Sequence, residues 1–175
     1  MTDRLGAMSQ STEVEVELRP PLHQVNPRAR WWWTAQALLT SLLLLGVEYL
    51  VFSWFSDWGP TPTAITTCSA VLGLLYLLVM PHWRFRVHRW ETSRDAVYTS
   101  SGWLWQEWRV APLSRIQTVD MQRGPLQLLF GLSSVRVTTA SAAGPVRIEG
   151  LTPDAAQGIV RHLTRRTQDT PGDAT

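Results

Sequence analysis

The sequence predicts an α+β membrane protein, in which a two-helix transmembrane hairpin is followed by a small β-barrel or sandwich of about seven strands with a C-terminal capping helix. Three observations lead to this fold class. Two long apolar runs occupy the first half of the chain, apolar and polar residues alternate through much of the second half, and one amphipathic segment follows near the end.

The two apolar runs are long enough to cross a bilayer, which takes roughly 20 helical residues. Residues 31–55 contain a single acidic residue and no basic one, and residues 64–80 contain neither. The segment between them, SDWGPTPT, carries the Gly and Pro residues of a tight turn. We expect helices at about 31–55 and 63–81, forming a hairpin over residues 31–81. A soluble core hairpin is disfavoured, because the rest of the chain could not cover two helices that are apolar all round.

Arginine placement predicts the orientation of this hairpin. The connecting turn contains no arginine, and its charged residue is Asp57. Arginines lie before the first helix and after the second: Arg19, Arg28, Arg30, Arg84, Arg86 and Arg89. Since cytoplasmic flanks carry the excess of basic residues, we expect a multi-pass protein of the cell (inner or plasma) membrane with both termini in the cytoplasm. Trp residues at the ends of both runs fit the aromatic belts of the two interfaces.

Glu48 is the one acidic residue within the predicted spans, and such a residue is by default a functional candidate. At a rise of about 1.5 Å per residue it should lie level with Ser69 and Ala70 on the second helix. A transport role as part of a larger complex is one hypothesis. A protonated or locally hydrogen-bonded Glu48 that serves helix packing is favoured, and the small residues Gly46 and Gly73 allow close helix contact.

The remaining chain predicts a cytoplasmic domain over residues 82–166. Expected strands cover RFRVHRW (84–90), AVYTSSG with a turn at 100–102, WLWQEWRVAP (103–112), RIQTVDMQRG (115–124), SSVRVTTAS (133–141) and PVRIEGL (145–151). The segment PLQLLFG is too brief for more than one or two helical turns. A closing helix follows Thr152, which is placed to cap it. Residues 1–30 are expected to form a cytoplasmic tail that is mostly disordered, although EVEVEL (13–18) could add as an edge strand, and residues 167–175 a disordered tail.

The motifs LSRIQ (113–117), GPLQ (124–127) and GL (131–132) carry a family resemblance. With the upstream strands and the short approach to a paired membrane span, they resemble the bacterial pleckstrin-homology-like domain (bPH2) of the YdbS-like membrane-flanked proteins. The resemblance covers residues 18–166. It implies a pleckstrin-homology-like (PH-like) fold and this topology, and it implies no catalytic residues.

Composition narrows the function classes. Sixteen arginines without lysine face 14 acidic residues, so the net charge of +2 does not favour nucleic acid. A single cysteine excludes an internal disulfide and a Cys-based metal cluster, and the four histidines lack metal-ligand spacing. No carboxylate pair, nucleophile elbow or phosphate-binding glycine loop is evident. We therefore expect no enzyme, and no catalytic, cofactor-binding or metal residues.

The predicted function is a non-enzymatic scaffold or interaction module at the cytoplasmic face of the membrane. Its expected partners are the lipid bilayer and another membrane protein of the same family or a second copy. An alternative is binding of anionic lipid head groups through the arginines near the membrane. The candidate lipid or partner surface comprises Arg84, Arg86, Arg89, Arg115, Arg123, Trp103 and Trp105. The simpler alternatives are that the arginines of residues 84–89 only determine the orientation of the hairpin in the membrane, and that the tryptophans are ordinary core or barrel-surface residues.

Overall fold

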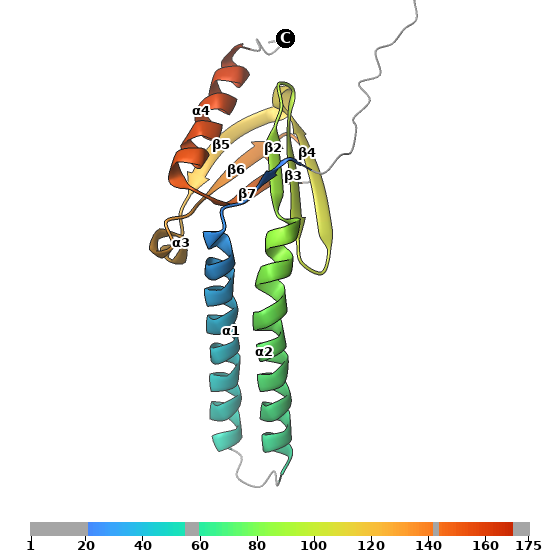
Figure 1. The fold of residues 1–175 in the computed structure, drawn as a ribbon, viewed down its shortest axis with the longest axis vertical. Helices are drawn as coiled ribbons and strands as arrows, with labels where there is room; N and C mark the ends of the chain where they lie inside the picture. Colours follow the sequence, from blue (N-terminus) through green and yellow to red (C-terminus); the bar gives the residue numbers. More distant parts are fainter. Residues whose placement is uncertain (1–20, 55–59, 142–143, 170–175) are drawn as a thin grey trace, which may run out of the picture.

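The computed structural model describes residues 21–54, 60–141 and 144–169. An antiparallel pair of long helices, α1 (Arg28–Ser53) and α2 (Thr61–Val87), carries a β-rich domain at one end (Figure 1). Both helices are long and apolar enough to cross a membrane, and only 6% of each apolar window is buried within the protein. They are therefore not core helices of the domain, and the predicted helical hairpin is present.

Helix α2 runs further than the sequence predicts. The strand expected at residues 84–90 is wrong, because the helix continues through Pro81 to Val87 and is capped by a hydrogen bond from the His88 amide to the Arg84 carbonyl, 2.9 Å. Strand β2 begins only at Arg89. Pro81, Arg84 and His88 lie at helical spacing on one face of this run. Arg84 and His88 on this face pack against Trp33 of α1. Helical and strand periodicities therefore coincide in this short run.

Two antiparallel sheets form the domain, a four-stranded sheet in the order β1-β2-β3-β4 and a three-stranded sheet in the order β5-β6-β7. The strands are β1 (His23–Gln24), β2 (Arg89–Thr92), β3 (Ala96–Gly102), β4 (Gln106–Pro112), β5 (Ile116–Gln122), β6 (Ser133–Thr139) and β7 (Val146–Leu151). No ladder joins the two sheets within the described ranges, so the barrel is open. Short helices connect the strands, η1 (Leu113–Arg115) and α3 (Pro125–Leu129), and α4 (Pro153–Asp169) closes the domain.

The turn predicted at residues 100–102 lies three residues later. Ser100 and Gly102 belong to β3, and residues 103–105 make the β3–β4 turn. Gly102 has φ +126°, and a Cβ at this position would collide with the carbonyl oxygen of Trp105. Only glycine can adopt this backbone conformation at position 102 without the clash, and Gly102 therefore allows the turn to close.

The domain core lies between the two sheets and α4. It consists of aliphatic side chains that are nearly all inaccessible: Val97, Ala111, Leu113, Val135, Val137, Val146, Ile148, Leu151, Ala156, Ile159 and Leu163. The Thr152 hydroxyl accepts a hydrogen bond from the Ala155 amide, 3.2 Å, which confirms the predicted cap of the closing helix.

A second buried cluster, here called the junction cluster, joins the hairpin to the domain. Its members come from both helices, from the segment before α1 and from the residue just before β6: Val25, Ala29, Trp32, Trp33, Ala37, Met80 and Leu132. Gly150 of β7, with φ +71°, approaches so closely that a Cβ there would lie 2.8 Å from the Ala29 Cβ. The helices therefore share a packed interior with the domain.

Within residues 21–30, which the sequence places in the cytoplasmic tail, β1 joins the four-stranded sheet and α1 begins at Arg28. β1 pairs with the outer edge of β2, the Asn26 amide donates to the Gly150 carbonyl at 2.8 Å, and the Gln24 side chain donates to the Phe85 carbonyl at 3.2 Å. The edge strand hypothesised for residues 13–18 lies outside the described residues.

Candidate functional site

A cavity of about 400 Å³ opens where the end of α2 meets the two sheets, and we call it the junction pocket. Its lining comes from α2 and the residue that caps it, from β3, β4 and β7, and from the segment before β7: Arg84, His88, Thr99, Ser101, Gly102, Glu107, Arg109, Pro145, Arg147 and Glu149. The pocket thus lies at the end of the domain nearest the hairpin.

Strand register explains why this end of the sheet is polar. On the inner face of β3 and β4, Val97 pairs with Ala111 and both belong to the domain core. The next pairs on the same face are Thr99 with Arg109 and then Ser101 with Glu107. Going toward the hairpin, the same face therefore changes from apolar to charged and hydrogen-bonding.

Most of the pocket's charges are paired. The Arg84 guanidinium donates to Glu149 at 2.9 Å. Arg109 donates to Glu107 at 2.6 Å and to the Pro145 carbonyl at 3.2 Å. Arg147 is exposed and has no carboxylate within ion-pair distance in the described chain. Three arginines against two glutamates give the pocket a net charge of +1.

His88 forms the floor where the pocket meets the junction cluster. It is 5% exposed, its Nδ1 lies 2.9 Å from the Arg84 carbonyl, and its ring centroid is 4.8 Å from that of Trp33. Burial, and secondarily the positive charge of Arg84, lower the pKa of His88 from 6.5 to about 4. The imidazole is therefore neutral near pH 7, and the pocket's positive charge comes from the arginines.

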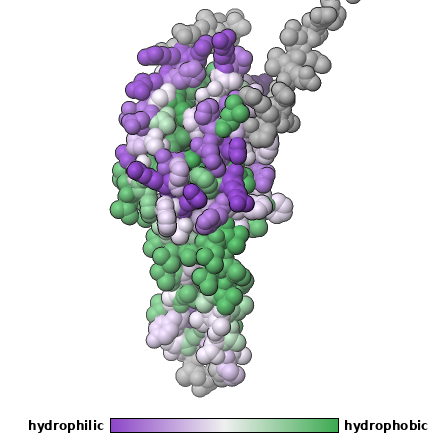
Figure 2. Space-filling model, viewed as in Figure 1, coloured by the Kyte–Doolittle hydropathy of each residue, from purple (hydrophilic) through white to green (hydrophobic). Residues whose placement is uncertain are grey.

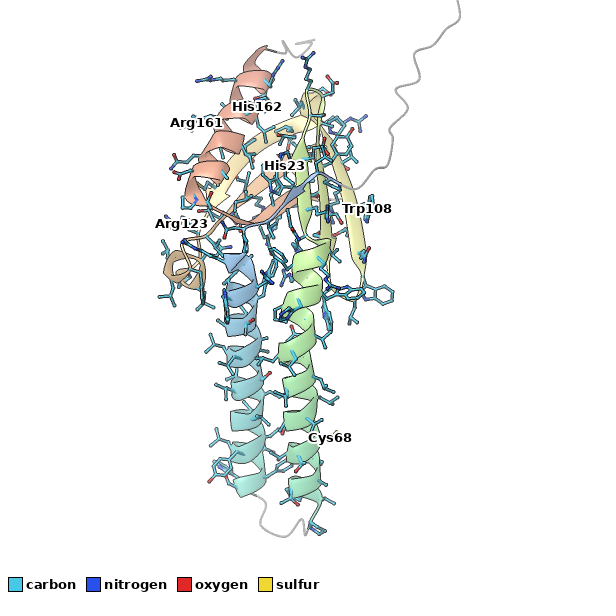
Figure 3. The ribbon with its side chains drawn as sticks, viewed as in Figure 1. His23, Cys68, Trp108, Arg123, Arg161 and His162 are labelled. Atoms are coloured by element: carbon cyan, nitrogen blue, oxygen red, sulfur yellow. The ribbon has the colours of Figure 1, made fainter. Side chains whose placement is uncertain are left out.

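The structure does not gather the five predicted surface arginines into one site. Arg84 lines the junction pocket, whereas Arg86 and Arg89 are exposed elsewhere. Arg123 lies beside α3 and donates to the Leu132 carbonyl at 3.2 Å (Figure 3). Arg115 belongs to η1. The Leu113 amide of η1 donates to the Asp95 carbonyl in the β2–β3 turn at 2.8 Å, and Figure 1 shows this turn at the end of the domain away from the hairpin.

The two predicted tryptophans lie in the β3–β4 turn rather than on a strand. Trp103 is half-buried and its ring meets Tyr76 of α2 edge to face, with centroids 5.7 Å apart. Trp105 is 87% exposed. Sequence reasoning missed Arg109, Arg147 and their carboxylate neighbours, although the alternation in β4 and β7 contained a signal, since it placed charged residues next to core positions.

Glu48 lies where the sequence predicts, because the Ser69 hydroxyl donates to its carboxylate at 2.6 Å. Its second oxygen is buried without a hydrogen-bond partner among the described residues. One turn further toward the domain, a Cβ on Gly73 would lie 3.2 Å from the Ser41 hydroxyl oxygen, so the small residue permits close helix packing. Within the described ranges, no three His, Cys, Asp or Glu side chains are grouped as a metal site.

Comparison with known proteins agrees with this architecture. A family model described as "Bacterial PH domain" matches residues 35–167. The chain is 28% identical over 159 residues to the UPF0699 transmembrane protein YdbS of Bacillus subtilis, which covers 85% of this chain and 96% of that protein. No solved structure matches the chain. Because the family model spans well over half of the sequence, and the sheets, closing helix and apolar hairpin agree with it, the chain belongs to the bacterial PH domain family.

Proposed function

We propose that this protein is a non-enzymatic interaction module anchored in the cell membrane, with both termini in the cytoplasm. The observation that carries the proposal is the junction cluster. Because one residue separates α2 from β2 and three separate β1 from α1, a domain that shares buried side chains with the hairpin has a fixed height and tilt relative to the bilayer. A binding surface on it is then presented in one orientation.

The partner surface of this module is the edge of β4. Among the described residues, this seven-residue strand ends its sheet and has no ladder partner on its outer side, and Trp108 and Val110 on its outward face are 44% and 37% exposed. An unpaired edge with exposed apolar residues is a template for addition of another strand. Trp108 lies at the side of the domain (Figure 3), and we propose that a neighbouring protein in the same membrane contacts it there. The partner is another family member or a second copy.

Photo-crosslinking in intact membranes tests this proposal. A photoreactive residue replaces Trp108 in the full chain, and Gln157 on the exposed side of α4 is the control position. We expect one discrete adduct with a membrane protein, or with a second copy, from position 108 alone. Equal labelling at both positions, or recovery of the protein in the soluble fraction after carbonate extraction, would contradict the module.

Recognition of an anionic group is a second candidate, and the observation that favours it is the net positive junction pocket with Arg147 unpaired. Thermal unfolding of the full chain in nanodiscs tests it. If the pocket binds head groups, Tm rises when anionic lipid replaces phosphatidylcholine, and the rise disappears in high salt and in Arg147→Gln. Arg165→Gln on α4 is the control that keeps the rise. An equal Tm in both lipids would exclude this function.

A further inference from the structure

Two apolar tips of the domain are unusually exposed. Leu104 and Trp105 in the β3–β4 turn are 71% and 87% exposed, and Leu128 and Leu129 on α3 are 55% and 77% exposed. We propose that both tips insert into the cytoplasmic leaflet of the bilayer that the hairpin crosses, so that lipid is their partner. This inference rests on the proposed membrane anchoring and adds a second, peripheral attachment to it.

The β3–β4 turn reaches the level of the apolar spans. Trp103 contacts Tyr76, which lies four residues before the buried Met80 of α2. At a rise of about 1.5 Å per residue, Tyr76 is about 6 Å further into the hairpin than Met80. The turn therefore extends past the end of the predicted span, and Leu104 and Trp105 follow directly after the residue that makes this contact.

Helix α3 reaches the same level from the other side. Its Leu126 lines a cavity of about 410 Å³ together with Gln36 and Thr40 of α1 and Tyr76 of α2. Figure 1 shows α3 and the β3–β4 turn on opposite sides of the hairpin, both at the end of the domain that faces it. Figure 2 shows hydrophobic surface at the α3 side of the domain, next to the band that surrounds the helices.

Both tips are held in place by the fold. Gly102 fixes the turn, as described above. In α3, the buried Gln127 accepts from the Gly124 amide at 3.0 Å and donates to the Ser134 hydroxyl at 2.7 Å, while the Leu132 amide donates to the Gln127 carbonyl at 2.7 Å. With its polar side chain turned inward, α3 presents its two leucines outward.

The geometry favours lipid over a protein as the occupant. The tips lie on opposite sides of the hairpin, so one partner protein would have to surround both helices to cover them, whereas a bilayer surrounds them by necessity. Trp side chains also prefer the membrane–water interface. Arg123 beside α3 adds a cation where anionic head groups lie.

Spin labelling of the full chain in liposomes tests the inference. Labels are attached to the native Cys68, which is exposed on α2, and, in a Cys68→Ser background, to single cysteines that replace Trp105, Leu129, Gln157 or Arg161. Accessibility to oxygen, which concentrates in lipid, is compared with accessibility to a water-soluble nickel chelate. We expect an oxygen-to-nickel ratio several-fold higher at positions 105 and 129 than at the control positions 157 and 161.

The label at Cys68 separates this inference from membrane anchoring. A hydrocarbon signal at Cys68 with aqueous signals at 105 and 129 would overturn the insertion of the tips and leave anchoring intact. Low accessibility to both oxygen and the nickel chelate at positions 105 and 129 would show that protein, and not lipid, covers the tips, and would also overturn their insertion. An aqueous signal at Cys68 itself would contradict the anchoring and the insertion together.

Discussion

The domain core and the junction cluster are two buried regions built from different residues for different tasks. The domain core is aliphatic and lies between two sheets and a helix, as in many globular domains. The junction cluster contains two tryptophans and draws its members from the N-terminal segment, both long helices and the residue just before β6. The first region decides whether the domain folds, and the second decides whether the folded domain is held rigidly on its helices.

Removing the fully buried tryptophan of the junction cluster should produce the largest effect. Trp33 is fully buried, with the Arg84 guanidinium 4.8 Å from its ring centroid. Trp33→Ala should lower the free energy of unfolding by about 3–5 kcal/mol, because it leaves a large cavity. Thermal unfolding in detergent measures this. The neighbouring Trp31 is 67% exposed, so Trp31→Ala is a matched control that should change little. Equal losses in the two variants would refute the junction cluster.

The matching change in the domain core is Leu163→Ala on α4. Leu163 is fully buried, and the substitution should cost about 2–5 kcal/mol by the same cavity argument. Unlike Trp33→Ala, it should free α4 to protease while the α2–β2 connection stays protected. Thr164→Ala, at an exposed neighbouring position, should leave proteolysis unchanged. If both α4 and the α2–β2 connection were cleaved in Trp33→Ala and in Leu163→Ala alike, the domain core and the junction cluster would unfold as one unit.

Acid should weaken the junction specifically. His88 takes up a proton in the unfolded chain near pH 6.5 but in the folded protein only near pH 4. Because the unfolded state binds more protons between these values, stability falls as the pH drops from about 6.5 to 4 and levels off below. The total loss is on the order of 3 kcal/mol, at about 1.4 kcal/mol per pKa unit. His88→Gln should flatten this part of a pH-dependent unfolding curve, whereas His162→Gln, at an exposed position, should not. An unchanged slope in His88→Gln would show that other groups cause it.

Gly150 tests the close approach of β7 to α1. Its positive φ and the 2.8 Å separation from the Ala29 Cβ predict a cost of about 1–3 kcal/mol for Gly150→Ala. Gly158 on α4 has open space around it, and Gly158→Ala should raise stability by about 0.5–1 kcal/mol through helix propensity. Chemical denaturation of both variants measures the change in the free energy of unfolding, which should be negative for Gly150→Ala and positive for Gly158→Ala. A neutral Gly150→Ala would mean that β7 and α1 separate easily.

Sequence patterns could predict what depends on local composition. The apolar hairpin, the level of Glu48 beside Ser69 and the Thr152 cap each follow from spacing along one or two segments. The extension of α2 past Pro81 and the shifted β3–β4 turn could not be predicted. Their short sequences fit two periodicities, and tertiary packing of His88 and the close approach at Gly102 decide between them.

The junction pocket could not be predicted from the sequence for a different reason. Its lining combines three segments far apart in the chain, residues 84–88, 99–109 and 145–149. The pairing of β3 with β4, the packing of β7 against these two strands and the docking of α2 bring these charges together. A sequence shows that Arg109 and Glu149 alternate with core residues, but it does not show which distant charge each one meets.

A distance measurement across the junction tests the central claim most directly. Spin labels on the native Cys68 of α2 and on a cysteine that replaces Arg161 of α4 report how the domain sits on its hairpin in liposomes (Figure 3). A domain packed on its helices through the junction cluster predicts one narrow distance distribution, which broadens in Trp33→Ala. A broad or multiple distribution in the otherwise unaltered protein would contradict it.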